Sequence, residues 1–329
     1  MQVGKGGRTV VITGSNSGIG KAAARRFAAE GDRVVMACRN LDAAEAARAE
    51  ILAGLEGASA EIMPLDVSSF ASVRQFASEF KGRHPHLDVL IHNAGYFNHG
   101  LRTYQFSPDG LERTFATNVF GPVLLTELLV EQLAASPDAR VLLAGSTIVK
   151  SFFDPRREIE FDNLQGEHAT SRPYAVYDKY RESKMGVVLV TRRLAQELAH
   201  RGVKVNCIMI PGVRVERHVL RKFTGRFRVI GTLTQYLNPF LRPPSRLART
   251  YYHICSDEEL KDVTGEQFDH HRRVLPVLPQ DQELNPFQLL RELLSSPTLT
   301  PAYAGAPENV DRMWEVVRKA IVSRHEDLQ

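Results

Sequence analysis

The feature that most constrains the fold is the alternation of short apolar runs with longer amphipathic stretches over the first two-thirds of the chain. Runs that are apolar throughout and rich in β-branched residues are typical of strands buried on both faces. The predicted strands are Arg8–Thr13, Arg33–Cys38, Ala60–Leu65, Asp88–His92, Arg140–Gly145 and Val203–Ile210. The predicted helices are Ile19–Ala29, Leu41–Leu52, Phe70–Lys81, Pro108–Ala134 and Tyr174–His200. This order predicts a doubly wound α/β fold with a parallel sheet.

Composition and cysteine use indicate a globular protein in a reducing compartment. The chain has 329 residues, 43% of them hydrophobic, and a net charge of +4. Cys38, Cys207 and Cys255 are odd in number and lack metal-ligand spacing, so we interpret them as reduced structural thiols. No signal peptide or long apolar span is visible, and we therefore expect a cytoplasmic protein. Metal-binding histidine motifs and nucleic-acid-binding modules are also absent from the sequence, so we expect neither ligand.

A glycine-rich turn joins the first predicted strand to the first predicted helix. A pyrophosphate needs backbone N–H groups, the positive end of a helix and no side chains in the way, and glycines meet the last condition. The strand–turn–helix context predicts that this turn binds the pyrophosphate of a dinucleotide. A purely structural turn is the alternative. The predicted cofactor-binding residues here are Gly14, Ser15, Asn16, Ser17, Gly18, Ile19 and Gly20.

The end of the second predicted strand indicates which dinucleotide is bound. An NAD site places an acidic residue here to accept hydrogen bonds from the ribose hydroxyls. This chain has Arg39, whose guanidinium can pair with a 2′-phosphate and stack on adenine, and Asn40 can add a donor. We therefore predict NADP(H) as the cofactor. The alternative is that Arg39 is a solvated side chain at the start of a loop.

The stretch Tyr180–Lys184 carries the predicted acid–base chemistry. Helical residues four apart share a face, so Tyr180 and Lys184 point together. A free phenol, with a pKa near 10, is a poor base at neutral pH, but a neighbouring ammonium stabilises the phenolate and lowers that pKa. Tyr180 is therefore the predicted general acid or base, and Lys184 the residue that adjusts it. Tyr174 and Tyr177 have no lysine four residues on, and we assign them to packing or to the pocket.

Together these motifs resemble the short-chain dehydrogenase/reductase family over about residues 7–213. The resemblance rests on the spacing TGxxxGxG at Thr13–Gly20 and on YxxxK at Tyr180–Lys184. Three further segments look most like the branch that contains retinol dehydrogenases, WW-domain oxidoreductases and light-dependent protochlorophyllide reductases. They are MACRN (Met36–Asn40), NVFG (Asn118–Gly121) and FDNLQGE (Phe161–Glu167). The resemblance implies a Rossmann-like fold and bulky, apolar carbonyl or alcohol substrates.

The same resemblance implies roles for further residues. Ser146 is expected to donate a hydrogen bond to the substrate oxygen, with Thr147 as the alternative. Asn118 is expected to hold a water in a proton relay to Lys184, or else to be a core asparagine bonded to backbone. Asp66 is expected to accept from the adenine amino group, or to cap a helix. The other residues expected at the cofactor are Val67, Asn93, Ala94, Gly95, Pro211, Gly212 and Val213.

Beyond Pro211 the chain departs from the family pattern. Glu216 stands where the family has a threonine that binds the nicotinamide carboxamide. Residues 201–250 hold eleven Lys/Arg against one acidic residue, and the basic segment 214–249 is interleaved with apolar side chains. We predict a lid over an apolar pocket here, with peripheral contact to anionic lipid as a secondary use. A solvated pair of surface helices is the alternative.

These inferences combine into one domain, residues 1–329, with three parts. Residues 7–213 form the cofactor-binding and catalytic core, 214–306 the substrate lid and insertions, and 307–323 a closing helix. The predicted function is hydride transfer between NADP(H) and a carbonyl or alcohol carbon of an apolar small molecule, with Tyr180 as general acid/base. One alternative is an NADP(H)-binding redox sensor or scaffold with little turnover. A second is an enzyme whose anionic substrates are attracted by the basic segment. The oligomeric state is left open.

Overall fold

The computed structural model describes residues 7–97, 100–214 and 241–326. Its centre is a seven-stranded parallel sheet in the order β3-β2-β1-β4-β5-β6-β7. The strands are β1 (Thr9–Thr13), β2 (Arg33–Cys38), β3 (Ser59–Pro64), β4 (Val89–His92), β5 (Arg140–Ala144), β6 (Lys204–Ile208) and β7 (Gln267–Phe268). The first six agree with the predicted strands to within two residues at each end, so the predicted parallel sheet is confirmed.

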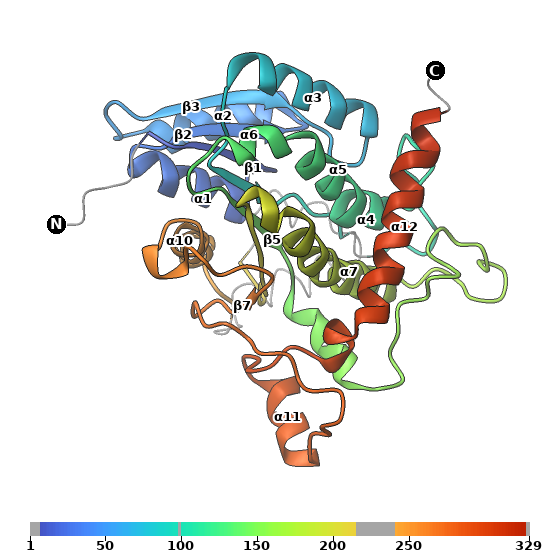
Figure 1. The fold of residues 1–329 in the computed structure, drawn as a ribbon. Helices are drawn as coiled ribbons and strands as arrows, with labels where there is room; N and C mark the ends of the chain where they lie inside the picture. Colours follow the sequence, from blue (N-terminus) through green and yellow to red (C-terminus); the bar gives the residue numbers. More distant parts are fainter. Residues whose placement is uncertain (1–6, 98–99, 215–240, 327–329) are drawn as a thin grey trace.

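Helices cover both faces of this sheet, which is the doubly wound arrangement (Figure 1). One face carries α1 (Gly18–Ala29), α2 (Leu41–Leu52) and α10 (Pro244–Ile254). The other carries α3 (Phe70–Arg83), α5 (Gly121–Leu128), α7 (Val176–Leu198) and α12 (Pro307–Glu326). Alternate strand residues point to opposite faces, so Val10 and Ile12 enter the first core while Val11 enters the second.

The single helix predicted over Pro108–Ala134 is wrong. The structure breaks it into α4 (Arg113–Phe115), a π-helical turn η1 (Ala116–Phe120), α5 and α6 (Val130–Ala134). Pro122 supplies no N–H to the helix ladder and stands at the start of α5. Gly121 also lies so close to the preceding loop that a Cβ would be 1.9 Å from the Val67 carbonyl oxygen. Close packing and the proline therefore interrupt a stretch whose apolar pattern is continuous.

Residues after β6 contribute to the sheet and its cover as well as to outer segments. α10 packs on α1, and β7 pairs with β6, although the sequence placed both within the lid and insertions. Further out lie α11 (Pro286–Leu294) and the short 3-10 helix η5 (Ala302–Gly305), followed by α12, which contains the predicted closing helix. Residues 215–240, with Glu216 and most of the basic segment, lie outside the described residues, so the lid stays a prediction.

The described ranges contain neither a candidate membrane span nor a candidate metal cluster. None of the helices there combines the length and apolarity that a bilayer span requires. Nor do three or more His, Cys, Asp or Glu side chains gather into a group that could hold a metal ion. The three cysteines are buried and free of disulfide bonds.

Candidate active site

The turn at the carboxyl end of β1 has no room for a side chain at Gly14 or Gly20. Gly14 and Gly18 have φ values of +64° and +57°, which favour glycine. A Cβ on Gly20 would lie 2.5 Å from the Gly14 carbonyl oxygen, and one on Gly14 would lie 3.0 Å from Ala94 Cα. α1 begins at Gly18, so its first N–H groups face this turn. The turn therefore fits a pyrophosphate, which needs backbone donors and close approach.

The other residues of the turn divide into two kinds. Asn16, Ser17 and Ile19 are partly exposed, and Ser17 stands at the N-cap of α1 without a side-chain capping bond. Ser15 is fully buried, and its hydroxyl donates to the Ile12 carbonyl oxygen at 3.0 Å. The side chain of Ser15 therefore holds the turn to β1, and only its backbone is left for a cofactor.

The loop after β4 is tied to the glycine turn by side chains. Asn93 donates from Nδ2 to the Thr13 carbonyl oxygen at 3.0 Å, and the Ala94 N–H donates to Thr13 Oγ1 at 3.0 Å. From α10, the Tyr251 hydroxyl donates to Asn93 Oδ1 at 3.2 Å. These contacts hold the loop Asn93–Gly95 against the turn, and its contact with a cofactor stays a prediction. Tyr251 gave no signal in the sequence, because it comes from a helix far along the chain.

At the ends of β2 and β3, Arg39 and Asp66 face each other. Arg39 Nη1 lies 3.5 Å from Asp66 Oδ2, and the Arg39 side chain is 61% exposed. Burial alone would raise the pKa of Asp66, but hydrogen bonds from Ser68 and the charge of Arg39 outweigh it and lower the pKa. Asn40 caps α2, with Oδ1 accepting from the Ala43 N–H at 2.9 Å. An exposed guanidinium beside an ionised carboxylate fits recognition of an adenosine phosphate and an adenine amino group.

Tyr180 and Ser146 meet across the carboxyl end of β5. Ser146 lies two residues beyond the end of β5 and caps the 3-10 helix η2 (Thr147–Phe153), while Tyr180 lies in the second turn of α7. Burial raises the pKa of Tyr180, and a hydrogen bond between the two hydroxyl groups lowers it in part. Ser146, rather than Thr147, therefore supplies the hydroxyl group that interacts with Tyr180. The two groups can therefore hold one substrate oxygen between them.

Lys184 lies one turn beyond Tyr180 on the same face of α7 and is buried. Its ammonium lies 5.7 Å from the centre of the Tyr180 ring and donates to the Ala144 carbonyl oxygen at 2.7 Å. Burial lowers the pKa of Lys184 to about 8. The side chain therefore remains cationic at neutral pH and close to Tyr180. The pKa of Tyr180 is nevertheless raised by burial and not lowered as the sequence predicted, and Lys184 is not among the groups that shift it.

Asn118 sits in the π-helical turn η1 and joins three segments. Its Oδ1 accepts from the Tyr96 N–H at 2.7 Å, and its Nδ2 donates to the Tyr96 carbonyl oxygen at 3.2 Å and to Ser183 Oγ at 3.0 Å. These contacts match the alternative interpretation of Asn118, namely a core asparagine bonded to backbone. A relay role for Asn118 would therefore have to use its backbone, and π-helical turns are frequent at functional sites. Ser183 was overlooked although it lies inside the Tyr180–Lys184 motif.

The segment Pro211–Val213 follows β6 at the same edge of the sheet. The Arg242 N–H donates to the Gly212 carbonyl oxygen at 3.0 Å, and the Arg214 N–H donates to the Arg242 carbonyl oxygen at 3.0 Å. Gly212 is exposed, whereas Pro211 and Val213 are partly buried. The segment therefore lies where the carboxyl ends of the strands meet, next to a part of the chain that the sequence did not connect with it.

An aromatic side chain stacks on the ring of Tyr180. Phe97 stacks on the Tyr180 ring with centres 4.2 Å apart, and its edge meets Tyr177 at 5.3 Å. Tyr177 is 48% exposed. These rings give the catalytic tyrosine an apolar surface on the side of the loop after β4. Phe97 was also overlooked in the sequence.

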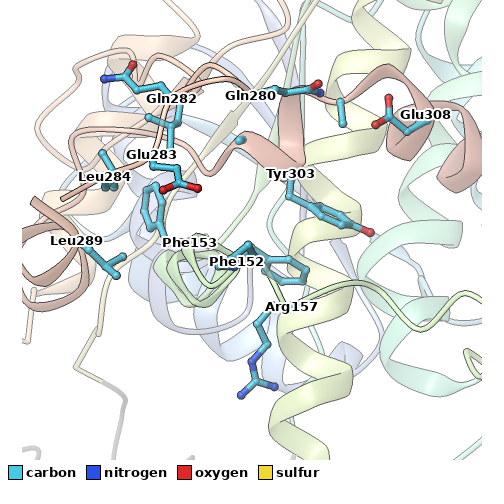
Figure 2. A pocket seen from close by; sticks show the side chains of 14 residues that line it. Phe152, Phe153, Arg157, Gln280, Gln282, Glu283, Leu284, Leu289, Tyr303 and Glu308 are labelled. Atoms are coloured by element: carbon cyan, nitrogen blue, oxygen red, sulfur yellow. The ribbon is translucent and has the colours of Figure 1, made fainter. Parts of the chain in front are cut away.

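A cavity of about 480 Å³ opens at the far end of η2, seven residues beyond Ser146 (Figure 2). Figure 2 shows Phe153 from η2 and Leu289 from α11 on one side and Tyr303 on the other. Its apolar lining consists of Phe152, Phe153, Leu278, Leu284, Leu289 and Tyr303. Glu283 and Glu308 also line it. At about 2 Å per residue along a 3-10 helix, this cavity begins about 14 Å from Ser146.

Comparisons with known proteins agree with this geometry. The profile of the short chain dehydrogenase family matches residues 8–153. Retinol dehydrogenase 12 of Mus musculus is 35% identical, covering 82% of this chain and 79% of its own. Retinol dehydrogenase 13 of Homo sapiens is 32% identical, covering 84% of this chain and 80% of its own.

Solved structures share the fold at lower identity. A short chain dehydrogenase from Shigella flexneri, complexed with NADP, is 22% identical with a TM-score of 0.61, covering 82% of this chain and all of its own. Levodione reductase is 21% identical with a TM-score of 0.62, covering 80% of this chain and 95% of its own. The likeness in sequence to the retinol dehydrogenases extends over most of both chains. The chain therefore belongs to the short-chain dehydrogenase/reductase family of oxidoreductases, near its retinol dehydrogenase branch.

Proposed function

We propose that this protein is an NADP(H)-dependent oxidoreductase that interconverts a carbonyl group and an alcohol on a bulky apolar molecule. The observation that carries the proposal is the meeting of Ser146, Tyr180 and Lys184 at the carboxyl end of β5, a short distance from the glycine turn. The three side chains come from a strand end and a helix, and each has a distinct chemical task.

In this proposal Ser146 and Tyr180 act on the substrate oxygen. The Ser146 hydroxyl donates a hydrogen bond that polarises a carbonyl, and Tyr180 Oη gives its proton to that oxygen in reduction or takes one from the alcohol in oxidation. Lys184 stays positively charged at neutral pH and stabilises the phenolate. NADP(H), when bound, supplies or accepts the hydride.

Asn118 is a positioning residue in this proposal. Its side chain joins Tyr96, which precedes the aromatic ring stacked on Tyr180, to Ser183 in the turn of α7 that carries Tyr180. The Ser183 hydroxyl in turn donates to the Tyr180 carbonyl oxygen at 2.8 Å. This chain of hydrogen bonds fixes the helical turn from which the phenol reaches the substrate.

The choice of NADP(H) rests on Arg39. Its guanidinium is exposed, carries a single weak partner and lies at the strand end where an NAD site places an acid. The complex of the related structure from Shigella flexneri with NADP supports this choice. The distance between Arg39 Nη1 and Asp66 Oδ2 is long, at 3.5 Å. A phosphate could therefore replace the Asp66 carboxylate as the partner of Arg39 at little cost in free energy.

The apolar character of the substrate is supported by two surfaces. Phe97 stacks on the Tyr180 ring and also contacts Tyr177, and the cavity at the end of η2 offers aromatic walls about 14 Å away. A long molecule with its reacting carbon at Tyr180 would reach this cavity with its far end. The relatives named retinol dehydrogenases support retinoids and similar long apolar alcohols and aldehydes as the first candidates.

The test is a screen of purified protein with NADPH or NADP⁺ against apolar aldehydes, ketones and alcohols of graded length, following NADPH absorbance. Turnover that rises with substrate length is expected. Tight NADPH binding, measured separately by fluorescence, with no turnover of any compound would contradict the enzyme and favour a sensor or scaffold.

A further inference from the structure

Positively charged side chains cluster beside Pro211–Val213, outside the catalytic group described above. Arg242 lies against this segment, because its N–H donates to the Gly212 carbonyl oxygen at 3.0 Å. Arg246, one turn further on in α10, places Nη2 3.3 Å from Nδ1 of His271. α10 also reaches the cofactor loop, since Tyr251 donates to Asn93. The cluster therefore lies at the carboxyl edge of the sheet, where ligands of this fold bind.

The centre of the cluster is His270, which follows β7. It is 3% exposed, and neither ring nitrogen has a hydrogen-bond partner. Its ring lies 4.0 Å from that of His271, and its backbone carbonyl accepts from Thr250 Oγ1 at 3.2 Å. A buried imidazole normally satisfies at least its N–H, so an unpartnered ring at a ligand-binding edge indicates a missing acceptor.

The charges around His270 do not balance within the described residues. Arg242, Arg246 and Asp269 all act electrostatically on its ring. The Asp269 carboxylate is already occupied, accepting from Arg273 Nη2 at 2.6 Å and Nε at 2.8 Å. No carboxylate of the described ranges pairs with Arg242 or Arg246. The positive charges of Arg242 and Arg246 thus act on His270 without a paired carboxylate of their own among the described residues.

The backbone adds to this field in two ways. α10 begins at Pro244 after Pro243, and no side chain caps its N-terminus, so the positive end of the helix lacks a side-chain acceptor. Arg272 is the one non-glycine residue in the described ranges with a positive φ, at 72°. Such strained residues collect at ligand sites and turns, and this one closes the tight turn that presents His270 and His271.

We propose that Arg242, Arg246 and His270 form a binding site for a phosphate or carboxylate group of a ligand held against Pro211–Val213. The two arginines supply charge-assisted hydrogen bonds, and the buried imidazole supplies an N–H donor. The site is separate from Arg39, which lies at the opposite half of the sheet beyond β1. The assignment of the anion to the cofactor or to a substrate rests on the proposed function. The existence of the anion site does not depend on it.

The first experiment measures inorganic phosphate binding by thermal unfolding at constant ionic strength, with chloride as the reference anion. Phosphate is expected to raise Tm of the wild type more than chloride does. The double variant Arg242→Gln/Arg246→Gln should weaken phosphate binding about tenfold or more. Arg249→Gln is the matched control, since Arg249 is exposed on the same helix. Equal phosphate responses in the wild type and the folded double variant would overturn the site.

His270→Phe provides a second variant that keeps the ring and removes both nitrogens. It should lower phosphate affinity while leaving the unfolding midpoint without phosphate unchanged or raised, because an unsatisfied polar group has been removed. A His270→Phe protein that binds phosphate as the wild type does would remove the imidazole from the site.

Two further measurements distinguish a cofactor anion from a substrate anion. If the group is the phosphate on the nicotinamide side, the double variant should bind NADPH less tightly and 2′,5′-ADP, which lacks that side, equally well. If it is a substrate acid, both affinities should be unchanged, and KM for an aldehyde bearing a carboxylate should rise relative to its neutral analogue. An unchanged NADPH affinity together with an unchanged KM for the carboxylate-bearing aldehyde would overturn the placement of the site beside the reaction. The phosphate and 2′,5′-ADP measurements remain informative even if no substrate is turned over.

Discussion

The two ends of the cofactor-binding edge are built in opposite ways. At the adenosine end, Arg39 is 61% exposed and is held by one contact of 3.5 Å. At the catalytic end, Lys184 is buried and donates at 2.7 Å to Ala144, and Asn118 makes three hydrogen bonds. Exposed pairs contribute little to stability, whereas buried polar groups cost free energy when a partner is lost.

This difference predicts how each end responds to substitution. Changes at the adenosine end should alter cofactor choice and leave the fold intact. Changes at the catalytic end should alter turnover and, where buried hydrogen bonds are cut, the free energy of unfolding as well. The predictions below test that division.

The largest effect is expected for Tyr180→Phe. Loss of the general acid should lower turnover by about two orders of magnitude or more, because the phenol is the group that exchanges a proton with the substrate oxygen. NADPH affinity should change little. Turnover is measured by NADPH absorbance, and NADPH binding by fluorescence titration.

Tyr177→Phe is the matched control for that variant, since Tyr177 lies one turn earlier in α7 and also contacts Phe97. Its turnover should stay close to that of the wild type. If Tyr180→Phe and Tyr177→Phe were equally active, the assignment of the proton donor would be wrong.

A second prediction concerns pH and the buried ammonium. The folded chain releases the Lys184 proton above a pKa of about 8, whereas the unfolded chain holds it up to the ordinary lysine pKa of 10.5. The unfolded state therefore binds more protons in this window, so the Lys184 contribution to stability increases as pH rises through it. Between about pH 7 and about pH 9.5 the gain should be about 2 kcal/mol.

The measurement is urea unfolding of the wild type and of Lys184→Met at both pH values. Burial raises the pKa of Cys207 to about 12, which acts in the opposite direction at higher pH, and the difference between the two proteins cancels that contribution. Parallel dependence on pH in both proteins would show that Lys184 titrates at its ordinary pKa.

At the adenosine end, Arg39→Ala should remove most of the preference for NADPH over NADH. We expect at least about a tenfold preference in the wild type, about 1.4 kcal/mol. NADH affinity and the unfolding midpoint should be unaffected, since the guanidinium is exposed. Titration of both cofactors against both proteins checks this, and equal affinities in the wild type would mean that Arg39 does not read the 2′-phosphate.

The smallest effect is expected at the cavity beyond η2. Phe153→Ala should raise KM for long apolar substrates about fivefold, near 1 kcal/mol of lost apolar contact, and leave short substrates unchanged. Phe153 is only partly buried, so the fold should tolerate the change. Identical KM values for long substrates in both proteins would place the substrate elsewhere.

Much of the fold could be predicted because its signals are local. The first six strands were located to within two residues at each end by their apolar runs, and α2 by its periodicity. β7 was missed because two residues carry no pattern. The helix over Pro108–Ala134 was drawn too long because periodicity does not register the close approach of Gly121 to Val67.

The candidate site shows the same limit. The glycine turn and the pair Tyr180 and Lys184 are short motifs, whose geometry follows from one turn or one helix. The contacts of Asn118 with Tyr96 and Ser183, and the stacking of Phe97 on Tyr180, join segments that the sequence keeps apart. Patterns over a few residues do not relate segments that lie far apart in the sequence, so these contacts could not be predicted from the sequence.

The sequence by itself determined the order of the first six strands, the shape of the glycine turn and the shared face of Tyr180 and Lys184, since each depends on a pattern over a few residues. The tertiary structure decided that Ser146 rather than Thr147 meets Tyr180, that Lys184 is buried enough for its pKa to fall, and that Arg242 lies beside Gly212 and acts on the ring of His270. These features depend on parallel strands ending at one edge of the sheet, where packing brings together residues that lie far apart along the chain.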